Sequence, residues 1–231
     1  MKILGIDTST MTGSIGLIED DRPLGQYSLS IEVTHSERLM NAIDRLLEGV
    51  RVKLDAIDGF AVSIGPGSFT GLRIGLGTVK GLCMATGKHA VSVSTLEALA
   101  SNMPFCSNLI CPILDARKKE VYTALFKYSA DGRIIRLTED MVLSPELLVE
   151  QIQEPVVFSG DGVYVYRDFL KKRLGGYAFF APVNSILPSG LSVAGIGMDR
   201  LKRGETIKDT EVPAYIRKSE AEVKLEIRGQ K

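Results

Sequence analysis

Short apolar runs alternate with stretches of helical periodicity along this chain, and the alternation is typical of an α/β protein. Apolar runs bounded by turn residues predict strands, while apolar residues three and four positions apart predict helices. In the first half of the chain, strands are expected at residues 2–6, 14–18, 24–31, 58–64 and 90–93. Helices are expected at residues 34–50, 69–86 and 95–101.

The two long helices of this half carry signals at their ends. Thr34 and Glu37 have the spacing of a capping box, in which each side chain satisfies a backbone N–H group of the other residue. Ser68 is the expected N-cap of the second long helix, and Gly87 is its expected end.

The order of elements repeats in the second half of the chain. Strands are expected at 109–114, 155–158 and 178–183, a hairpin at 120–128 and 133–137, and helices after residue 144, after residue 162 and at 188–203. In this repeat Asp115 corresponds to Asp7, and Gly160 corresponds to Gly65. A period of roughly one hundred residues exceeds the ~20–50 residues of solenoid repeats, so it indicates a duplicated domain.

The duplication predicts two facing lobes of β-β-β-α-β-α form, which is the architecture of actin, Hsp70 and the sugar kinases. We expect residues 1–103 to form the first lobe, residues 104–205 a second, degenerate lobe, and residues 206–231 a C-terminal tail. In this fold, the turn after the first strand of each lobe faces the phosphates of a nucleotide in the cleft. Unrelated α/β elements that follow the same order by chance are the alternative.

The helix expected at residues 69–86 contains four interior glycines, Gly71, Gly75, Gly77 and Gly81. Each costs roughly 1 kcal/mol relative to alanine, about 4 kcal/mol in all, so another interaction must offset the cost. Gly75 and Gly77 lie about 200° apart around the helix, so the glycines form rows on nearly opposite faces. A row of small residues lets another backbone come close. We expect one face to pack on the lobe's own sheet and the other to meet a helix.

That helix could come from residues 34–50 of the same chain or from another subunit. In the second case, the first lobe carries the partner-binding helices, and apolar residues complete the surface. The expected interface consists of Leu39, Met40, Ile43, Gly71, Leu72, Gly75, Leu76, Val79 and Cys83. The alternative is packing within one chain, which would cover both faces of the helix from inside the molecule.

Composition narrows the classes of function. Lys plus Arg and Asp plus Glu each number 28 and no long basic block occurs, so the chain lacks a basic footprint for holding nucleic acid. The three cysteines form no disulfide framework, which favours a reducing compartment, and we expect a cytoplasmic protein. The apolar stretches are too short for a membrane span or a signal peptide, and no membrane contact is expected.

Four segments carry a family resemblance. Residues 6–9 read Ile-Asp-Thr-Ser, residues 65–75 read Gly-Pro-Gly-Ser-Phe-Thr-Gly-Leu-Arg-Ile-Gly, residues 92–99 read Ser-Val-Ser-Thr-Leu-Glu-Ala-Leu, and residues 213–222 read Pro-Ala-Tyr-Ile-Arg-Lys-Ser-Glu-Ala-Glu. These segments resemble the TsaB (YeaZ) family, densely over residues 1–100 and more weakly in the second lobe. The glycine-rich run is highly specific, whereas the opening Asp-Thr is not.

The resemblance implies a role in making N6-threonylcarbamoyladenosine in tRNA. In that pathway TsaD carries the metal and transfers the group, TsaB binds TsaD as a non-catalytic scaffold, and TsaE, an ATPase, docks on the pair. Members of the family also form homodimers through the first-lobe helices. The resemblance therefore implies a TsaD-type partner, a TsaE-type ATPase, a homodimer when the chain is alone, and only indirect contact with tRNA.

The chain offers few groups for catalysis. Its two histidines, His35 and His89, lie far apart in the sequence, so no pair one helical turn apart exists to hold a metal. No Ser-His-Asp constellation can be aligned from them, and no Walker A sequence occurs. We expect no catalytic residue, no metal and no resident cofactor, with ATP or ADP at the partner interface left open.

The loops that would face a nucleotide are altered. The first runs from Asp7 to Gly13 without the Asp-x-Gly of active members of this fold, and Ala116 and Arg117 follow Asp115 where glycine would stand. Weak nucleotide contact is expected at Asp7, Thr8, Ser9, Gly160 and Gly162. An equally weighted role for Asp7 is to cap local N–H groups at the strand end. The alternative function is an actin-fold ATPase or small-molecule kinase that uses the cleft.

Overall fold

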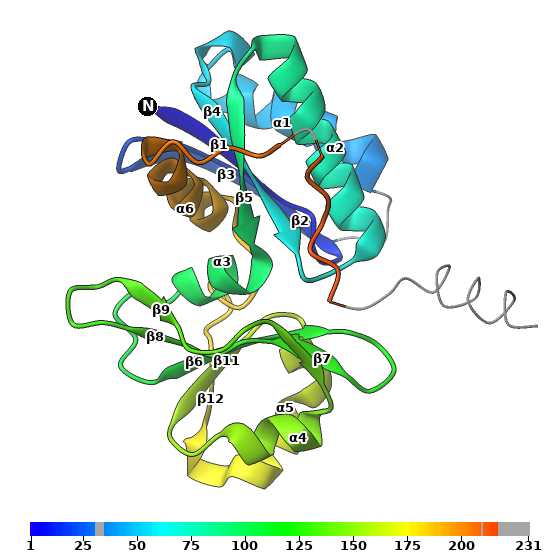
Figure 1. The fold of residues 1–231 in the computed structure, drawn as a ribbon, viewed down its shortest axis with the longest axis vertical. Coiled ribbons are helices and arrows are strands. Elements are labelled where there is room, and N and C mark those ends of the chain that lie inside the picture. The colour runs from blue at the N-terminus through cyan, green and yellow to red at the C-terminus, as the bar shows by residue number, and fades with distance from the viewer. Residues whose placement is uncertain (31–34, 209, 217–231) are drawn as a thin grey trace, which may run out of the picture.

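The computed structural model describes residues 1–30, 35–208 and 210–216, with only the backbone of residues 30 and 35–38. The described chain forms two lobes, each built around one β-sheet (Figure 1). Thr34 and the side chain of Glu37 lie outside the described parts, and so does the expected capping box.

The first sheet has five strands in the order β3-β2-β1-β4-β5. Their bounds are β1 Lys2–Asp7, β2 Thr12–Glu19, β3 Arg22–Ser30, β4 Gly59–Gly65 and β5 His89–Ser94. The central strand β1 pairs antiparallel with β2 and parallel with β4. Strands β1 and β4 are almost entirely buried because helices cover both faces of the sheet (Figure 1).

Helices α1 (His35–Val50) and α2 (Phe69–Thr86) cover one face of this sheet, and α3 (Thr95–Ser101) leads to the second lobe. The predicted ends of α2 are confirmed. Ser68 Oγ accepts a hydrogen bond from the Gly71 backbone N–H at 3.3 Å. Gly87 ends the helix in the left-handed region, with φ of 70°, which glycine adopts without steric cost.

The second sheet has seven strands, with β10-β7-β6-β11-β12 along its main path and β8 joining β6 to β9. Their bounds are β6 Leu109–Asp115, β7 Val121–Thr123, β8 Phe126–Tyr128, β9 Ile134–Arg136, β10 Met141–Leu143, β11 Val156–Ser159 and β12 Ala178–Phe180. Strand β6 pairs antiparallel with β7 and parallel with β11, as β1 does with β2 and β4. Helices α4 (Pro145–Gln151) and α5 (Gly162–Leu174) belong to this lobe.

The hairpin expected at 120–128 and 133–137 is only partly correct. The first of these runs breaks into β7 and β8, and only β8 pairs with β9, while β7 pairs with β10. The break lies at Ala124 and Leu125, where the Leu125 N–H donates to Thr138 Oγ1 at 2.9 Å instead of joining a ladder. The apolar pattern alone does not show this interruption, because both residues are buried like their neighbours.

The last helix, α6 (Gly190–Lys202), packs on the first sheet, although residues 104–205 were expected to form the second lobe (Figure 1). A Cβ added at Gly5 or Gly16 would overlap the backbone of α6, so the helix lies directly on β1 and β2. Arg200 Nη2 also reaches Glu97 at 2.7 Å. The physical reason is that the face of the first sheet opposite α1 and α2 needs a cover. The remaining domain limits stay a prediction.

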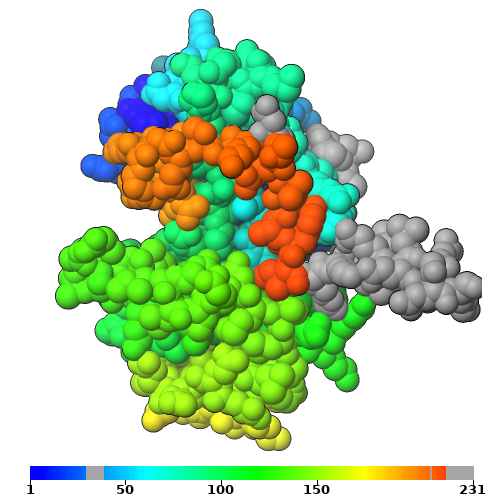
Figure 2. Space-filling model, in the orientation of Figure 1, coloured from blue at the N-terminus to red at the C-terminus, as the bar shows by residue number. Residues whose placement is uncertain are grey.

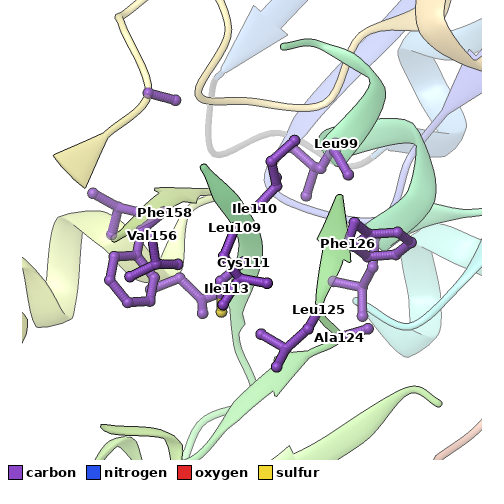
Figure 3. Close-up of a cluster of buried hydrophobic side chains, with 14 of the residues drawn as sticks. Leu99, Leu109, Ile110, Cys111, Ile113, Ala124, Leu125, Phe126, Val156 and Phe158 are labelled. Atoms are coloured by element: carbon purple, nitrogen blue, oxygen red, sulfur yellow. The ribbon is translucent and has the colours of Figure 1, made fainter. Parts of the chain in front are cut away.

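The second lobe has its own apolar core, part of which is shown in Figure 3. Leu99 of α3 reaches into it beside Ile110 and Phe126, so α3 ties the lobes together through packing. Cys111 is fully buried in this core, and its burial raises the pKa of its thiol to about 12. A buried thiol with so high a pKa stays protonated at neutral pH and is a poor nucleophile.

After α6 the chain returns across the first lobe towards α2. In Figure 2 its orange and red atoms cross the surface and end beside the second lobe. The backbone N–H of Ile207 donates to Ala90 O of edge strand β5 at 2.8 Å, which covers part of that edge. We call residues 210–216, the last described part of this segment, the strap.

Candidate functional site

The carboxylate of Asp7, at the end of β1, is fully buried. One oxygen accepts from the backbone N–H of Ser9 at 2.9 Å and from Ser9 Oγ at 2.7 Å. The other accepts from Ser63 Oγ at 2.5 Å. Asp7 therefore acts on its own backbone and its neighbouring strand, which matches the capping role weighed for it from the sequence.

The first glycine row consists of Gly71 and Gly75 of α2 together with Gly67, just before the helix, and it packs on the turn that follows Asp7. A Cβ at Gly71 would overlap the carbonyl oxygen of Thr8, a Cβ at Gly75 would overlap Thr8 Oγ1, and a Cβ at Gly67 would overlap Ser9 O. In return, Thr8 Oγ1 donates to Gly71 O at 2.7 Å. This row is therefore explained inside the molecule, because it lets α2 approach the end of β1.

A cavity of about 330 Å³ lies between the lobes. The first-lobe turns, the second-lobe loop after β6 and the strap form its wall. Its lining residues are Ser9, Thr10, Met11, Pro66, Gly67, Ser68, Phe69, Leu114, Asp115, Arg117, Lys118, Tyr122, Asp161, Ala214, Tyr215 and Ile216. Of the five residues expected to contact a nucleotide, only Ser9 lines it. Asp7 and Thr8 are buried behind the wall, and Gly160 and Gly162 pack on Ile113 O.

The second-lobe side of the cavity carries charges of both signs. Asp115 accepts from the Arg117 backbone N–H at 2.9 Å and pairs with Arg117 Nη1 at 3.3 Å. Asp161 accepts from the Asp115 backbone N–H at 3.1 Å, and burial raises the pKa of its carboxyl group above the usual value. The lining therefore carries two acidic and two basic side chains, Asp115 and Asp161 with Arg117 and Lys118.

The loop after β6 is also strained. Arg117, Lys118 and Lys119 have φ of 61°, 52° and 61°, in the left-handed region that costs L-residues roughly 1–2 kcal/mol each. A phosphate-binding loop places glycine there, so that backbone N–H groups can approach the anion. This loop has arginine and lysine at those positions instead.

No cluster of three or more His, Cys, Asp or Glu side chains suited to a metal occurs among the described residues. His89 is exposed at the start of β5, away from the cavity lining, and of His35 only the backbone is described. Helices long and apolar enough to cross a membrane are likewise absent from the described ranges.

The second glycine row of α2 is open. A Cβ at Gly77 or Gly81 would meet no atom within 4 Å, and both residues are exposed. Met84, one turn after Gly81, leaves 88% of its surface exposed. We call Gly77, Gly81 and Met84 the open face of α2.

The open face differs from the interface expected from the sequence. Of the nine residues named for it, Met40 is 45% exposed and Cys83 is half-buried. The other seven are buried in the chain's own core: Leu39, Ile43, Gly71, Leu72, Gly75, Leu76 and Val79. The interface residues were predicted from their apolar character, but apolar residues mark the faces of α1 and α2 that pack on the core. The glycine rows were the signal for the open face, and the contact with a partner stays a prediction.

Comparisons with known proteins agree on a family. A family model described as "TsaD: tRNA N6-adenosine threonylcarbamoyltransferase" matches residues 30–225. A Bacillus subtilis protein named "tRNA threonylcarbamoyladenosine biosynthesis protein TsaB" is 32% identical over 227 residues, covering 97% of each chain. An Escherichia coli protein with the same name is 29% identical and covers 97% of this chain and 98% of its own.

The transferase relatives cover less. A Methylorubrum extorquens tRNA N6-adenosine threonylcarbamoyltransferase is 33% identical, but the match spans 59% of this chain and 45% of that protein. The family model therefore reflects a part shared by TsaD and TsaB, whereas the two TsaB proteins above match over 97% of this chain.

Solved structures support the same assignment. YeaZ from Pseudomonas aeruginosa superposes with a TM-score of 0.76 and 28% identity, over 93% of this chain and 99% of that one. A ROK hexokinase from Thermus thermophilus superposes with a TM-score of 0.52 at 14% identity, which shows the fold alone. The duplicated actin-like fold predicted from the sequence is thus confirmed, and the chain belongs to the TsaB (YeaZ) family.

Proposed function

We propose that this chain is a cytoplasmic, non-catalytic subunit of the machinery that makes N6-threonylcarbamoyladenosine in tRNA. It binds a TsaD-type transferase subunit through the open face of α2 and the neighbouring edge of α1, and a TsaE-type ATPase docks on that pair. It reaches tRNA only through the complex. The names of its full-length relatives support the pathway, and the open face supports the binding role.

The observation that carries the binding role is the unexplained cost of Gly77 and Gly81. Each glycine in a helix interior costs about 1 kcal/mol relative to alanine. In the first row, close packing on Thr8 and Ser9 offsets that cost. In the second row, an added Cβ at Gly77 or Gly81 would meet no atom of the described chain within 4 Å. A helix from another subunit packed against Gly77 and Gly81 would account for it, because only small residues let two helix backbones come close.

The non-catalytic role rests on how the polar groups are used. Asp7 is buried and saturated by hydrogen bonds from Ser9 and Ser63. The cavity lining contains no histidine, and its aspartates are held by Arg117 and by a backbone N–H group. General acid–base catalysis needs a group whose proton can be exchanged with a substrate at working pH. We expect no transfer activity from this chain alone.

The inter-lobe cavity keeps a second candidate open, an actin-fold ATPase or small-molecule kinase. Its volume of about 330 Å³ falls in the range of small-molecule sites. ATP or ADP held there, or at the partner interface, would be a ligand rather than a substrate under our proposal. Steady-state ATP hydrolysis by the purified chain, at a rate well above background, would favour the second candidate.

The test of the binding role uses two glycine variants of the full chain. Gly81→Leu places a bulky side chain on the open face, and Gly195→Leu does the same on α6, where an added Cβ also meets nothing. Each is mixed with a purified TsaD-type subunit, and the mass of the complex is measured by light scattering. We expect the wild type and Gly195→Leu to form a heterodimer and Gly81→Leu to stay apart. A heterodimer formed by Gly81→Leu at wild-type yield would contradict the proposal.

A further inference from the structure

Phe69 and Arg73 of α2 form a compact cluster with Tyr215 of the strap. The rings of Phe69 and Tyr215 are stacked, with centroids 4.2 Å apart and planes 19° from parallel. The Arg73 guanidinium lies over the Phe69 ring at 4.0 Å from its centroid, and its Nε donates to the Tyr215 hydroxyl oxygen at 2.8 Å. One face and one edge of the guanidinium are thus held by aromatic side chains.

The strap holds Tyr215 in place through backbone contacts of its own. The Ala214 N–H donates to Ile64 O at 2.8 Å, which joins the strap to the end of β4. Lys80 lies two turns after Arg73 in α2, and its Nζ donates to Glu211 O at 2.8 Å. The absence of a side chain at Gly65 is required here, because a Cβ there would lie 2.8 Å from Ala214 O. The strap is therefore docked at both of its ends.

The terminal nitrogens of the Arg73 guanidinium suit a ligand. Arginine has five N–H donors, and among the described residues only Nε makes a hydrogen bond. Arg73 also has no ion pair with any carboxylate in the described part of the chain, and it is exposed. The two terminal nitrogens form a planar fork that matches a carboxylate in two parallel hydrogen bonds.

The fork stands at one end of the open face. Arg73, Gly77 and Gly81 are spaced by four residues, so they follow one side of the helix, and Met84 lies next to them. A partner helix seated on the glycines would pass over Arg73. Phe69 and Tyr215 form an aromatic clamp that already fixes the Arg73 side chain. Little conformational entropy is therefore lost when the fork binds, which is the property of an interface anchor.

We propose that Arg73, held by Phe69 and Tyr215, is an anchor of the partner surface that takes a carboxylate of the TsaD-type subunit. The strap is then part of the binding surface, since it positions the anchor from the far end of the chain. This inference rests on the proposed function. It adds the chemistry of the contact, a carboxylate of the partner placed beside a helix that packs on Gly77 and Gly81.

The experiment is a titration of the full chain with the TsaD-type subunit by isothermal calorimetry, at 50 and 500 mM NaCl. Close charge pairs across an interface show coupling of about tenfold or more in affinity, so we expect Arg73→Gln to raise Kd by about tenfold or more at low salt. Salt weakens an exposed ion pair, so the wild-type Kd should rise with salt more steeply than that of Arg73→Gln. A residue that only anchors the strap would leave this salt dependence unchanged.

Two further variants separate the charge from its positioning. Arg73→Lys keeps the charge but loses the planar fork, and we expect most of the affinity to be lost with it. Tyr215→Phe keeps the stacked ring and removes the oxygen that accepts from Nε, and we expect Kd to rise about threefold, the effect of one hydrogen bond of modest strength. Circular dichroism melting of each variant confirms that it is folded at the titration temperature.

The outcomes distinguish this inference from the function on which it rests. If Gly81→Leu abolishes binding while Arg73→Gln keeps the wild-type Kd and salt dependence, the anchor is wrong and the partner surface stands. If Gly81→Leu binds as the wild type does, the partner surface is wrong, and the anchor with it. A tenfold loss in Arg73→Gln with a flatter salt dependence supports the anchor.

Discussion

The two glycine rows of α2 predict stability changes of opposite sign for the same substitution. In Gly81→Ala the new Cβ enters open space, so the variant gains only the helix propensity of alanine, about 1 kcal/mol. For a chain of 231 residues, this raises Tm by about 2–4 °C. In Gly71→Ala the new Cβ overlaps the carbonyl oxygen of Thr8, and α2 must move away from the end of β1.

The cost of that movement can be worked from the contacts. Overpacking a tight interface costs about 1–3 kcal/mol, and loss of the bond from Thr8 Oγ1 to Gly71 O adds about 1 kcal/mol. The alanine propensity returns about 1 kcal/mol. The net destabilisation of Gly71→Ala is therefore about 2 kcal/mol, equivalent to a Tm about 4–8 °C lower.

Thermal melting followed by circular dichroism checks both values, with Gly195→Ala of α6 as the matched control for an open helical glycine. Melting at two protein concentrations is needed, because a homodimer through α2 would make Tm rise with concentration. The reasoning fails if Gly81→Ala lowers Tm while Gly195→Ala raises it, or if Gly71→Ala melts at the wild-type temperature.

Three further predictions concern the rest of the molecule. In native protein, a thiol reagent should modify Cys83 and leave Cys111 unmodified until unfolding, because Cys111 is buried with a pKa of about 12; mass spectrometry of digests locates the labels. Asp161→Asn should be more stable than wild type at pH 7, since the folded-state pKa of Asp161 is raised above 3.8 and ionisation costs the folded state. Urea titrations should show that advantage shrinking as the pH falls below the unfolded-state pKa of 3.8, where the carboxyl group becomes protonated in both states; a constant difference would contradict the burial argument. Gly190→Ala should lower the urea midpoint of unfolding, because its Cβ would overlap β2 between Ile15 and Gly16.

Much of the fold could be predicted because its signals are local. Ser68 and Gly87 mark the ends of α2 by hydrogen bonds and backbone geometry within one turn, and the repeat of Asp7 and Asp115 at the ends of β1 and β6 follows from order along the chain. The sheet on which α6 packs could not be predicted from local signals. Its periodicity shows that a helix forms, but either sheet presents an apolar face that it could cover.

The candidate site shows the same division. The two rows of α2 were visible as glycine spacing, but which row faces the interior depends on where the turn at Thr8 lies in space. Apolar residues such as Leu76 and Val79 were placed at the interface because sequence cannot distinguish a core face from a docking face of similar hydrophobicity. Arg73 and Tyr215 are more than one hundred positions apart in the sequence, so no local pattern predicts that Tyr215 contacts Arg73.

The return of α6 to the first sheet has a consequence for how the protein is made. Strands β1 to β5 leave the ribosome early, but one face of their sheet stays bare until Gly190–Lys202 has been synthesised. The N-terminal half therefore cannot complete its fold during most of translation, and a fragment ending near residue 103 would expose apolar strand surface to water. Cutting the chain between its repeats would separate the first sheet from the helix that covers one of its faces.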